Sequence, residues 1–374
     1  MKIVITGGGT GGHILPLLAV AKELKKITQD QKLELFYVGP KIEIENIAFS
    51  QLDIKKKIIL AGKLRRYISI KSIFINTFDM LKMLIGIIQA FFIFLFSRPK
   101  LVFSKGGYGS FPVIVAAKLL GIPVFLHESD AIQGLANKVG SFFADRIFVA
   151  FSNLVEMFPG KKVYWVGNPV REELLNGDKE EADVYFSITK TKPVIFIVGG
   201  SQGAQRINEM FLNTLAEFCA EYELIHQCGK DNLDVTKRAA EMMLPDHLKS
   251  FYHLYGFLSE EQMKNALAAC DVVISRAGAG SIFEIAAAGK PSILIPLPES
   301  AQNHQFQNAY LYAKDGAAIV LEEGNFSQHM LLQELEKLFN NPELLAKMSL
   351  EAKKFAKPDA AKQMAEYIKE FIVA

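Results

Sequence analysis

A glycine-rich segment that ends in a histidine, GGGTGGH, occupies residues 7–13 of the chain. Glycines let backbone N–H groups approach a ligand closely, and the N-terminus of a helix that follows such a turn favours an anion. The same helix dipole disfavours an imidazolium, so we expect His13 to stay neutral and able to accept a proton. The segment therefore predicts a phosphate site with His13 as a general base. The alternative is a histidine that only caps or packs at the helix start.

The same glycines also match a dinucleotide-binding fingerprint, because Gly7, Gly9 and Gly12 satisfy the spacing GxGxxG. In that fold an acidic residue at the end of the next strand holds the adenosine ribose. The next expected strand, LELFYVG, ends without one. Binding of NAD or FAD is therefore disfavoured, and we expect no cofactor.

Polar side chains follow two further predicted strands. The segment VFSKGGYGSFP (102–112) repeats the order of strand, glycine turn and helix, with Pro112 in the first helical turn. The segment IPVFLHESD places His127, Glu128 and Asp130 directly after a buried strand. Ligands of open α/β sheets bind at the carboxyl ends of the strands. Glu128 and Asp130 are therefore candidate bases beside His13.

The second half of the chain offers another set of phosphate and sugar contacts. GGSQGA (199–204) combines backbone donors with the Ser201 hydroxyl at a helix entrance, and it lacks the GxxxxGK[ST] pattern of P-loop ATPases. In SRAGAGSIFE the turn can bind a pyrophosphate, while Glu284 either accepts two ribose hydroxyls or is simply a charge near a helix N-terminus. The amides at 302–305 suit sugar hydroxyls or a solvated loop, and Arg171 is either a phosphate contact or a surface arginine.

The elements that position these residues form two similar halves. The length of 374 residues is about twice that of a usual domain. Runs rich in β-formers alternate with helical patterns, which predicts α/β architecture with parallel sheets. The expected strands lie at KIVIT, LELFYVG, KLVFS, IPVFLHE, RIFVAF and KVYWVG, and then, after VGNPVR, at PVIFIVGG, YELIHQCG, FYHLYGF, DVVIS and PSILIPLP. The tail from about 343 to 374 is predicted to be helical.

Composition excludes several classes of protein. A hydrophobic content of 50% with 22% charged residues excludes a disordered or collagen-like chain, and a net charge of +2 disfavours a nucleic-acid binder. The three cysteines have no CxxC spacing, which fits a reducing cytosol and no zinc site. Because the chain has no Asp-x-Asp motif, we expect no essential protein-bound metal.

A basic segment precedes the most apolar part of the chain. Seven lysines and arginines lie within residues 55–71, followed by an apolar stretch at 73–96. The longest uninterrupted apolar run, 84–96, is shorter than the ~20 residues that span a bilayer. We therefore expect contact with anionic lipids at a membrane surface without crossing of the membrane. A buried core helix beside a solvated basic face is the alternative.

Together these motifs resemble the MurG family of bacterial peptidoglycan N-acetylglucosaminyltransferases. GGGTGGHI, KGGYGSFP, HESDAIQGLANK, VGNPVR, GGSQGA, SRAGAGSIFEIAAAGKPSILIP and NHQFQNA occur in consistent order over residues 7–309. The resemblance implies a GT-B fold, in which two Rossmann-like parallel-sheet domains face each other across a cleft. It further implies inverting transfer of GlcNAc from UDP-GlcNAc to lipid I, which makes lipid II, at the cytoplasmic face of the membrane.

The resemblance also assigns regions and residues. It implies an acceptor and membrane-facing domain at 1–167 with the C-terminal helix at about 352–374, and a UDP-GlcNAc-binding domain at 168–351. Thr10, Gly11 and Gly12 would lie near the diphosphate and the acceptor, with His13 as the candidate base. The implied donor contacts are Arg171, Ser201, Leu258, Ala279, Gly280, Ser281, Ile282, Phe283, Glu284 and Gln305.

Two positions depart from the family pattern. Asp130 stands where the family usually has asparagine, and Gly109 replaces a commoner valine. The acidic group at Asp130 bears on both recognition of the donor sugar and the identity of the base. The alternatives are a related lipid glycosyltransferase with another acceptor, such as diacylglycerol, a UDP-GlcNAc epimerase, and an inactive membrane scaffold that binds the nucleotide sugar.

Overall fold

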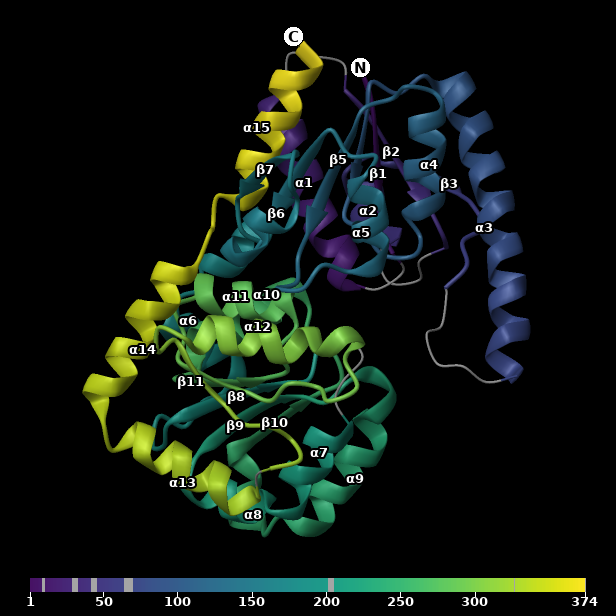
Figure 1. The fold of residues 1–374 in the computed structure, drawn as a ribbon. Coiled ribbons are helices and arrows are strands. Elements are labelled where there is room, and N and C mark those ends of the chain that lie inside the picture. The colour runs from purple at the N-terminus through teal and green to yellow at the C-terminus, as the bar shows by residue number, and fades with distance from the viewer. Residues whose placement is uncertain are drawn as a thin grey trace. The chain divides into compact units, whose positions relative to one another are not determined.

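The computed structural model describes residues 1–8, 11–28, 33–41, 46–63, 70–200, 205–325 and 327–373. The chain divides into two compact units, one formed by Met1–Pro169 with Lys357–Ala374 and the other by Val170–Ala356. Each unit contains a parallel β-sheet with helices on both faces (Figure 1). Thr10 and Ser201, both predicted ligand contacts, lie outside the described residues.

In the described part of the first unit, a seven-stranded sheet has the order β3-β2-β1-β4-β5-β6-β7. Its strands are β1 (Lys2–Thr6), β2 (Glu34–Gly39), β3 (Lys55–Ile58), β4 (Leu101–Ser104), β5 (Val124–Glu128), β6 (Arg146–Val149) and β7 (Lys162–Trp165). The strand order reverses between β1 and β4, and such a switch point is where open α/β sheets bind ligands.

Alternate side chains of these strands enter two separate cores. Ile3 and Ile5 pack with α1 (Gly11–Ile27) and α15 (Ala360–Val373), whereas Val4 belongs to the cluster on the opposite face. The other helices of this unit are α2 (Asn46–Gln51), α3 (Ile70–Ser97), α4 (Phe111–Leu119), α5 (Leu135–Ser141) and the 3-10 helix η1 (Ser152–Met157). The apolar residues that recur at helical spacing in α1 are buried, namely Ile14, Leu17, Leu18, Ala21 and Leu24.

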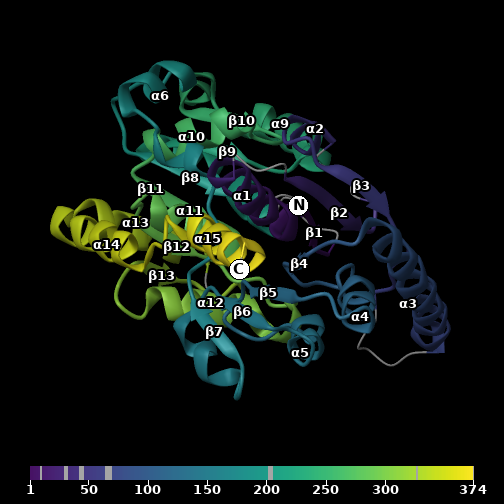
Figure 2. The ribbon, with the colours of Figure 1, turned by 90° about the horizontal axis from the view of Figure 1, so that it is seen from above.

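The C-terminal helix returns to this first unit. It lies beside α1 in both views of the ribbon (Figures 1 and 2), and its residues Met364, Ile368 and Ile372 are buried. The guanidinium of Arg146 lies over four aromatic rings, two of which come from α15 itself. Burial of an apolar face and these ring contacts together hold the helix on the sheet.

The second unit repeats the design, and in its described residues a six-stranded sheet has the order β10-β9-β8-β11-β12-β13. Its strands are β8 (Val194–Val198), β9 (Glu223–Gln227), β10 (Tyr252–Tyr255), β11 (Val272–Ser275), β12 (Ser292–Leu294) and β13 (Ala318–Val320). The strand order reverses between β8 and β11. The motifs GGSQGA and SRAGAG follow these two strands directly.

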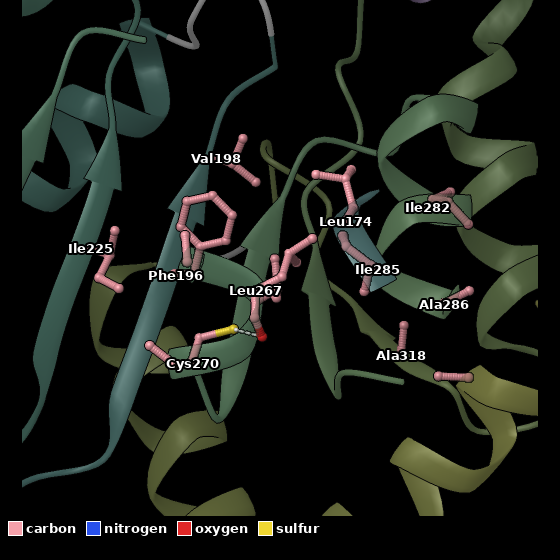
Figure 3. Packing of buried hydrophobic residues seen from close by; sticks show 14 of the residues in the cluster. Leu174, Phe196, Val198, Ile225, Leu267, Cys270, Ile282, Ile285, Ala286 and Ala318 are labelled. Atoms are coloured by element: carbon pink, nitrogen blue, oxygen red, sulfur yellow. Dashed lines mark hydrogen bonds between the residues drawn. The ribbon is translucent and has the colours of Figure 1, made fainter. Parts of the chain in front are cut away.

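Helices pack on both faces of this second sheet. They are η2 (Glu172–Leu175), α6 (Lys179–Phe186), α7 (Gln205–Asn213), α8 (Leu215–Glu221), η3 (Lys230–Asn232), α9 (Leu233–Met243), η4 (Asp246–Phe251), α10 (Glu260–Ala269), α11 (Ala279–Ala287), η5 (Ala301–Asn303), α12 (His304–Ala313), α13 (Gln328–Phe339) and α14 (Pro342–Phe355). Phe196 and Val198 of β8 share one cluster with Ile282 and Ile285 of α11 (Figure 3). This cluster packs α11 against the sheet and so fixes the position of the glycine turn that precedes the helix.

Every strand expected from the sequence forms, and the structure adds β3 and β13. β3 has the sequence KKKI, which lacks the apolar alternation of a half-buried strand, and all four residues are exposed. It forms by pairing with β2 at the edge of the sheet. The predicted helical tail is confirmed, with an interruption at 356–359 that separates α14 from α15.

The prediction that the apolar segment is too short to cross a membrane was wrong. It counted only the uninterrupted run 84–96, whereas α3 continues through the polar side chains that precede this run. Its segment Phe74–Ser97 has 24 residues and contains an 18-residue window with a mean hydropathy of 2.1, which suffices by length and composition for a membrane span. At a rise of about 1.5 Å per residue it is roughly 36 Å long.

Candidate functional site

Two glycine turns meet at the switch point of the first sheet. The Gly8 N–H donates to the Gly106 carbonyl oxygen over 2.8 Å, so the turn after β1 lies directly on the turn after β4. A Cβ added to Gly107 would lie 2.7 Å from the Gly8 Cα and 2.8 Å from the His13 Nε2. The approach therefore requires glycine, and it places the imidazole of His13 against the second turn.

The first residues of α1 lie at the same edge of the sheet. Gly11 and Gly12 open the helix, and a Cβ added to Gly12 would meet nothing within 4 Å. Gly12 is exposed and His13 is half-buried. The predicted helix start is confirmed, and a ligand at this edge would meet a helix N-terminus and one imidazole.

Glu128 ends β5 and is buried, with 3% of its surface exposed. Its Oε2 accepts from the Gly134 N–H at 2.8 Å and from the Asn137 Nδ2 at 2.9 Å, while its Oε1 accepts from the Asp130 N–H at 3.3 Å. Burial and, next, the charge of Asp130 raise the pKa of Glu128 to about 7. Its oxygens are thus committed to holding the turn between β5 and α5.

A buried lysine, which the sequence analysis did not single out, follows β4. Lys105 is 2% exposed, and its Nζ contacts His127, Ser129 and Asn168. Burial lowers the pKa of Lys105 to about 7, while the charges of Glu128 and Asp130 act in the opposite direction. The available signal was a lysine that directly follows the apolar strand LVFS, where a buried site is expected.

In the second unit, Arg171 and Glu284 form an ion pair. Both the Nη2 and the Nε of Arg171 donate to the Glu284 Oε1, at 2.9 and 3.2 Å. Within the described residues the Oε2 accepts no hydrogen bond, and the two side chains are 18% and 20% exposed. One oxygen is therefore held by the guanidinium while the other stays available to hydroxyl donors.

The N-terminus of α11 presents backbone donors. Gly278 is its N-cap in extended conformation, with no side-chain cap, and the first amide that donates into the helix is that of Ile282, to the Gly278 carbonyl. The preceding amides of Ala279, Gly280 and Ser281 are thus available to an anion. Ile282 and Phe283 are buried in the core, so their side chains are placed for packing.

Two glutamine side chains accept hydrogen bonds from backbone N–H groups near the remaining predicted contacts. The Leu258 side chain is 2% exposed, and its N–H donates to the Gln227 Oε1 at 3.0 Å. Gln305, in the first turn of α12, acts in the same way, because its Oε1 accepts a hydrogen bond from the Leu297 N–H at 2.9 Å. The Leu258 N–H is therefore already bound by Gln227, a supporting residue that the sequence analysis missed.

An apolar stripe runs along α3 on the first unit. Its large side chains recur every three or four residues and are exposed, namely Phe74, Phe78, Leu81, Ile85, Ile88, Phe92 and Leu95. On the inner face Ala90 and Phe94 are buried, and a Cβ added to Gly86 would overlap the Leu60 carbonyl oxygen. The helix packs beside α4 (Figures 1 and 2). Its outer apolar face is therefore exposed and available for contact with another apolar surface.

The chain matches both domains of one enzyme family. Residues 3–149 match the glycosyltransferase family 28 N-terminal domain, and residues 194–364 match the glycosyltransferase family 28 C-terminal domain. The chain belongs to glycosyltransferase family 28. This family 28 enzyme has two parallel sheets in two domains, which is the GT-B fold that the sequence predicted.

Two relatives of this family 28 enzyme are named for the same transferase reaction. A Bacillus anthracis protein, called UDP-N-acetylglucosamine–N-acetylmuramyl-(pentapeptide) pyrophosphoryl-undecaprenol N-acetylglucosamine transferase 2, is 39% identical over 343 residues, which are 91% of this chain and 92% of the relative. A Clostridium kluyveri protein of the corresponding name is 40% identical over 338 residues, 90% of this chain and 91% of the relative.

Two solved structures share the fold of this chain, and the more similar of the two also agrees with this membership. The crystal structure of Acinetobacter baumannii MurG superposes with a TM-score of 0.74 at 28% identity and covers 99% of each chain. A UDP-GlcNAc 2-epimerase from Neisseria meningitidis bound to UDP-GlcNAc gives a TM-score of 0.67 at 16% identity, covering 99% of this chain and all of that one. The second likeness concerns the fold alone.

Proposed function

We propose that this family 28 enzyme transfers GlcNAc from UDP-GlcNAc to lipid I and so forms lipid II for peptidoglycan. The observation that carries the proposal is the identity of 39% over nine-tenths of the chain to a transferase named for this reaction. The enzyme is a UDP-GlcNAc-dependent hexosyltransferase. The two glycine-lined sheet edges supply what such a transfer needs, a phosphate cradle and a proton acceptor.

The second unit binds the donor in this proposal. The free amides of Ala279, Gly280 and Ser281 face the diphosphate, and Glu284 accepts hydroxyls of the ribose. Arg171 holds the Glu284 Oε1 and carries the positive charge nearest to that carboxylate. As UDP leaves, negative charge grows on its phosphate, where preorganised amides stabilise it without reorganisation. In this proposal Leu258 lies near the uracil and Gln305 lies near the sugar.

The first unit supplies the acceptor side and the base. The neutral imidazole of His13 takes the proton of the muramyl hydroxyl while that oxygen attacks C1 of GlcNAc. The bond from C1 to the UDP oxygen breaks on the opposite face, so the configuration at C1 inverts. Glu128 is bound on both oxygens inside its own turn, which favours a positioning role for it over that of the base.

The stripe on α3 gives the enzyme its place on the membrane. Since the inner face of the helix is packed on the first unit, the outer face enters the cytoplasmic leaflet and the enzyme is peripheral. The exposed lysines of β3 add attraction to anionic lipids. This arrangement brings the first unit to the bilayer that holds the acceptor's lipid.

One assay separates the acceptors. Purified protein is incubated with labelled UDP-GlcNAc and either a lipid I analogue, diacylglycerol or no acceptor. We expect the label to enter only the lipid I analogue. Folded protein that binds UDP-GlcNAc but labels diacylglycerol, or that converts the sugar without an acceptor, would contradict the proposal and favour another lipid transferase or an epimerase.

The role of Glu284 predicts a loss of nucleotide affinity. Glu284→Ala should weaken UDP binding by about 1.5–3 kcal/mol, since hydrogen bonds to a charged group have this magnitude. Isothermal titration calorimetry with UDP measures the change. The matched control is Glu260→Ala, which removes an exposed acid from the first turn of α10 and should leave the affinity unchanged. Equal affinity in both variants would make Glu284 a mere helix-terminal charge.

A further inference from the structure

Glu323 bridges two arginines at the carboxyl edge of the second sheet. It lies shortly after β13, and its side chain is 16% exposed. Its Oε1 accepts from the Arg206 Nη1 at 2.7 Å, and its Oε2 forms an ion pair with the Arg276 Nη1. Arg276 follows β11 directly, and Arg206 lies in the first turn of α7, the helix that follows β8. One carboxylate therefore joins the segments that follow the two strands of the switch point.

The guanidinium of Arg276 is the buried member of this network. Its side chain is 8% exposed, and its Nη1 also donates to the carbonyl oxygens of Ile295, at 3.1 Å, and Pro296, at 3.4 Å, which follow β12. A guanidinium keeps its charge when it is buried, so it requires an opposite charge, and Glu323 supplies one. Arg276 and Glu323 together tie the ends of β11, β12 and β13 to one another.

The two ion pairs of Glu323 differ in their expected weight. Arg206 is more than half exposed, and so is Glu299, the second acid that it binds. Exposed ion pairs contribute little, because solvent screens them. Removing one partner of a buried pair costs far more, since it leaves an uncompensated charge. The effect of Glu323 should therefore be transmitted mainly through Arg276.

Arg276 directly precedes the turn that opens α11. Gly278 is the N-cap of this helix, and the free amides of the first helical turn follow it. Farther along the same helix, Ile282 and Ile285 are packed in the core (Figure 3). Glu284 lies between them in the sequence and is held by its own arginine. A displaced Arg276 would therefore move the amides at the helix start and leave Glu284 in place.

We propose that Glu323 is a positioning residue for the donor diphosphate, because it holds Arg276 and Arg276 holds the turn whose amides bind the phosphates. This inference rests on the proposed function, which assigns the diphosphate to the N-terminus of α11. Glu323 acts through Arg276 and does not touch the nucleotide. Its own negative charge is matched by two arginines, so its repulsion of the phosphates is small. Loss of Glu323 should weaken binding of the phosphates and spare that of the nucleoside.

Two ligands separate these contributions in the full-length enzyme. Glu323→Gln keeps the size of the side chain and removes its charge. We expect the Kd for UDP, measured by calorimetry, to rise by about 3- to 30-fold, as for coupled residues of one salt-bridge network. The Kd for uridine, measured by ligand-observed NMR titration, should be unchanged. Glu322→Gln is the matched control, because it makes the same substitution at the next residue, whose carboxylate binds Tyr310 and Asn325 instead, and should change neither constant.

Equal losses of affinity for UDP and uridine would indicate a general loosening of the second unit and would overturn the proposal. An affinity for UDP that is unchanged or higher would also overturn it, because the carboxylate would then act on the phosphates by repulsion at most. Thermal melting checks that each variant is folded. Where Glu323→Gln does not fold, Glu323→Asp keeps the charge on a shorter side chain, and the same selective loss for UDP is expected with a smaller factor.

These binding measurements need no acceptor, so they are independent of the transfer reaction. A selective loss for UDP in an enzyme that does not label the lipid I analogue supports the role of Glu323 and contradicts the proposed function. Labelling of the lipid I analogue by the wild type, together with equal losses for UDP and uridine in Glu323→Gln, contradicts the role of Glu323 alone.

Discussion

Replacing His13 with alanine should lower kcat by about 10²- to 10⁴-fold and leave the affinity for UDP nearly intact, as expected for loss of a general base. The imidazole lies at the N-terminus of α1 and against Gly107, on the first unit, whereas the proposed contacts to UDP lie on the second. Its loss therefore removes a proton acceptor without removing a nucleotide contact. Single-turnover transfer to the lipid I analogue and calorimetry with UDP measure the two quantities separately.

Variants of the two other candidate bases, Glu128 and Asp130, are compared with His13→Ala. Glu128→Ala is expected to lower activity through disorder of its turn, because three hydrogen bonds end on its oxygens. Asp130→Ala tests the other candidate base. If His13→Ala keeps most activity while Asp130→Ala loses it with folding and donor binding preserved, the base is Asp130. Gly107→Ala is a second probe of the imidazole, since the added Cβ would lie 2.8 Å from the His13 Nε2.

The glycine turns could be predicted from the sequence because their chemistry is local. A strand of apolar residues, a run of glycines and a helical apolar period lie within about twenty residues of one another, and each has its own signature. The close approach of Gly8 and Gly107 also follows from parallel topology, since both turns end adjacent strands. The fold class and both sheet edges were therefore predictable.

Contacts that depend on distant segments were not predictable. Nothing in KGGYG shows that Lys105 reaches Asn168, because the two are 63 residues apart and meet only when β4 and the segment after β7 converge. The pairing of Arg171 with Glu284, 113 residues apart, is of the same kind. β3 likewise takes its strand conformation from β2 rather than from its own sequence. In each case tertiary packing, rather than the local sequence, determines the contact or the conformation.

The exposed stripe of α3 predicts strong membrane binding that a few substitutions should abolish. Phe78→Ser, Ile85→Ser and Phe92→Ser together remove apolar side chains that would each gain about 1.5–3 kcal/mol on entering lipid. Because about 1.4 kcal/mol is a factor of ten, the partition into vesicles should fall by about three orders of magnitude or more. Flotation with vesicles containing anionic lipid measures the bound fraction.

The control for this variant removes exposed apolar side chains elsewhere. Val184→Ser, Val235→Ser and Met242→Ser change residues of the second unit whose side chains are as exposed as those of the stripe. Binding should be unchanged. A loss as large as that from the α3 variant would point to general hydrophobicity rather than to one face of the first unit.

Salt and charge substitutions then measure the electrostatic part. Changing Lys55, Lys56, Lys57, Arg65 and Arg66 to Gln should weaken binding to anionic vesicles, since each basic group near such a surface contributes about 1 kcal/mol. The difference from the wild type should shrink as salt rises, because screening acts over about 8–10 Å at physiological ionic strength. Binding that ignores both salt and these substitutions would leave the apolar stripe as the sole anchor.

Extraction distinguishes a helix that lies on the membrane from one that crosses it. The inner face of α3 is committed to the protein, where Ala90 and Phe94 are buried and the Leu60 N–H donates to the Gln89 Oε1 at 2.8 Å. A crossing helix would have to give up these contacts and expose the core beneath it, which costs more than shallow insertion of the outer face. The bound protein should therefore be released from vesicles by alkaline carbonate. Protein that stays with the lipid after this treatment, or that binds no anionic vesicle at low salt, would contradict peripheral attachment through α3.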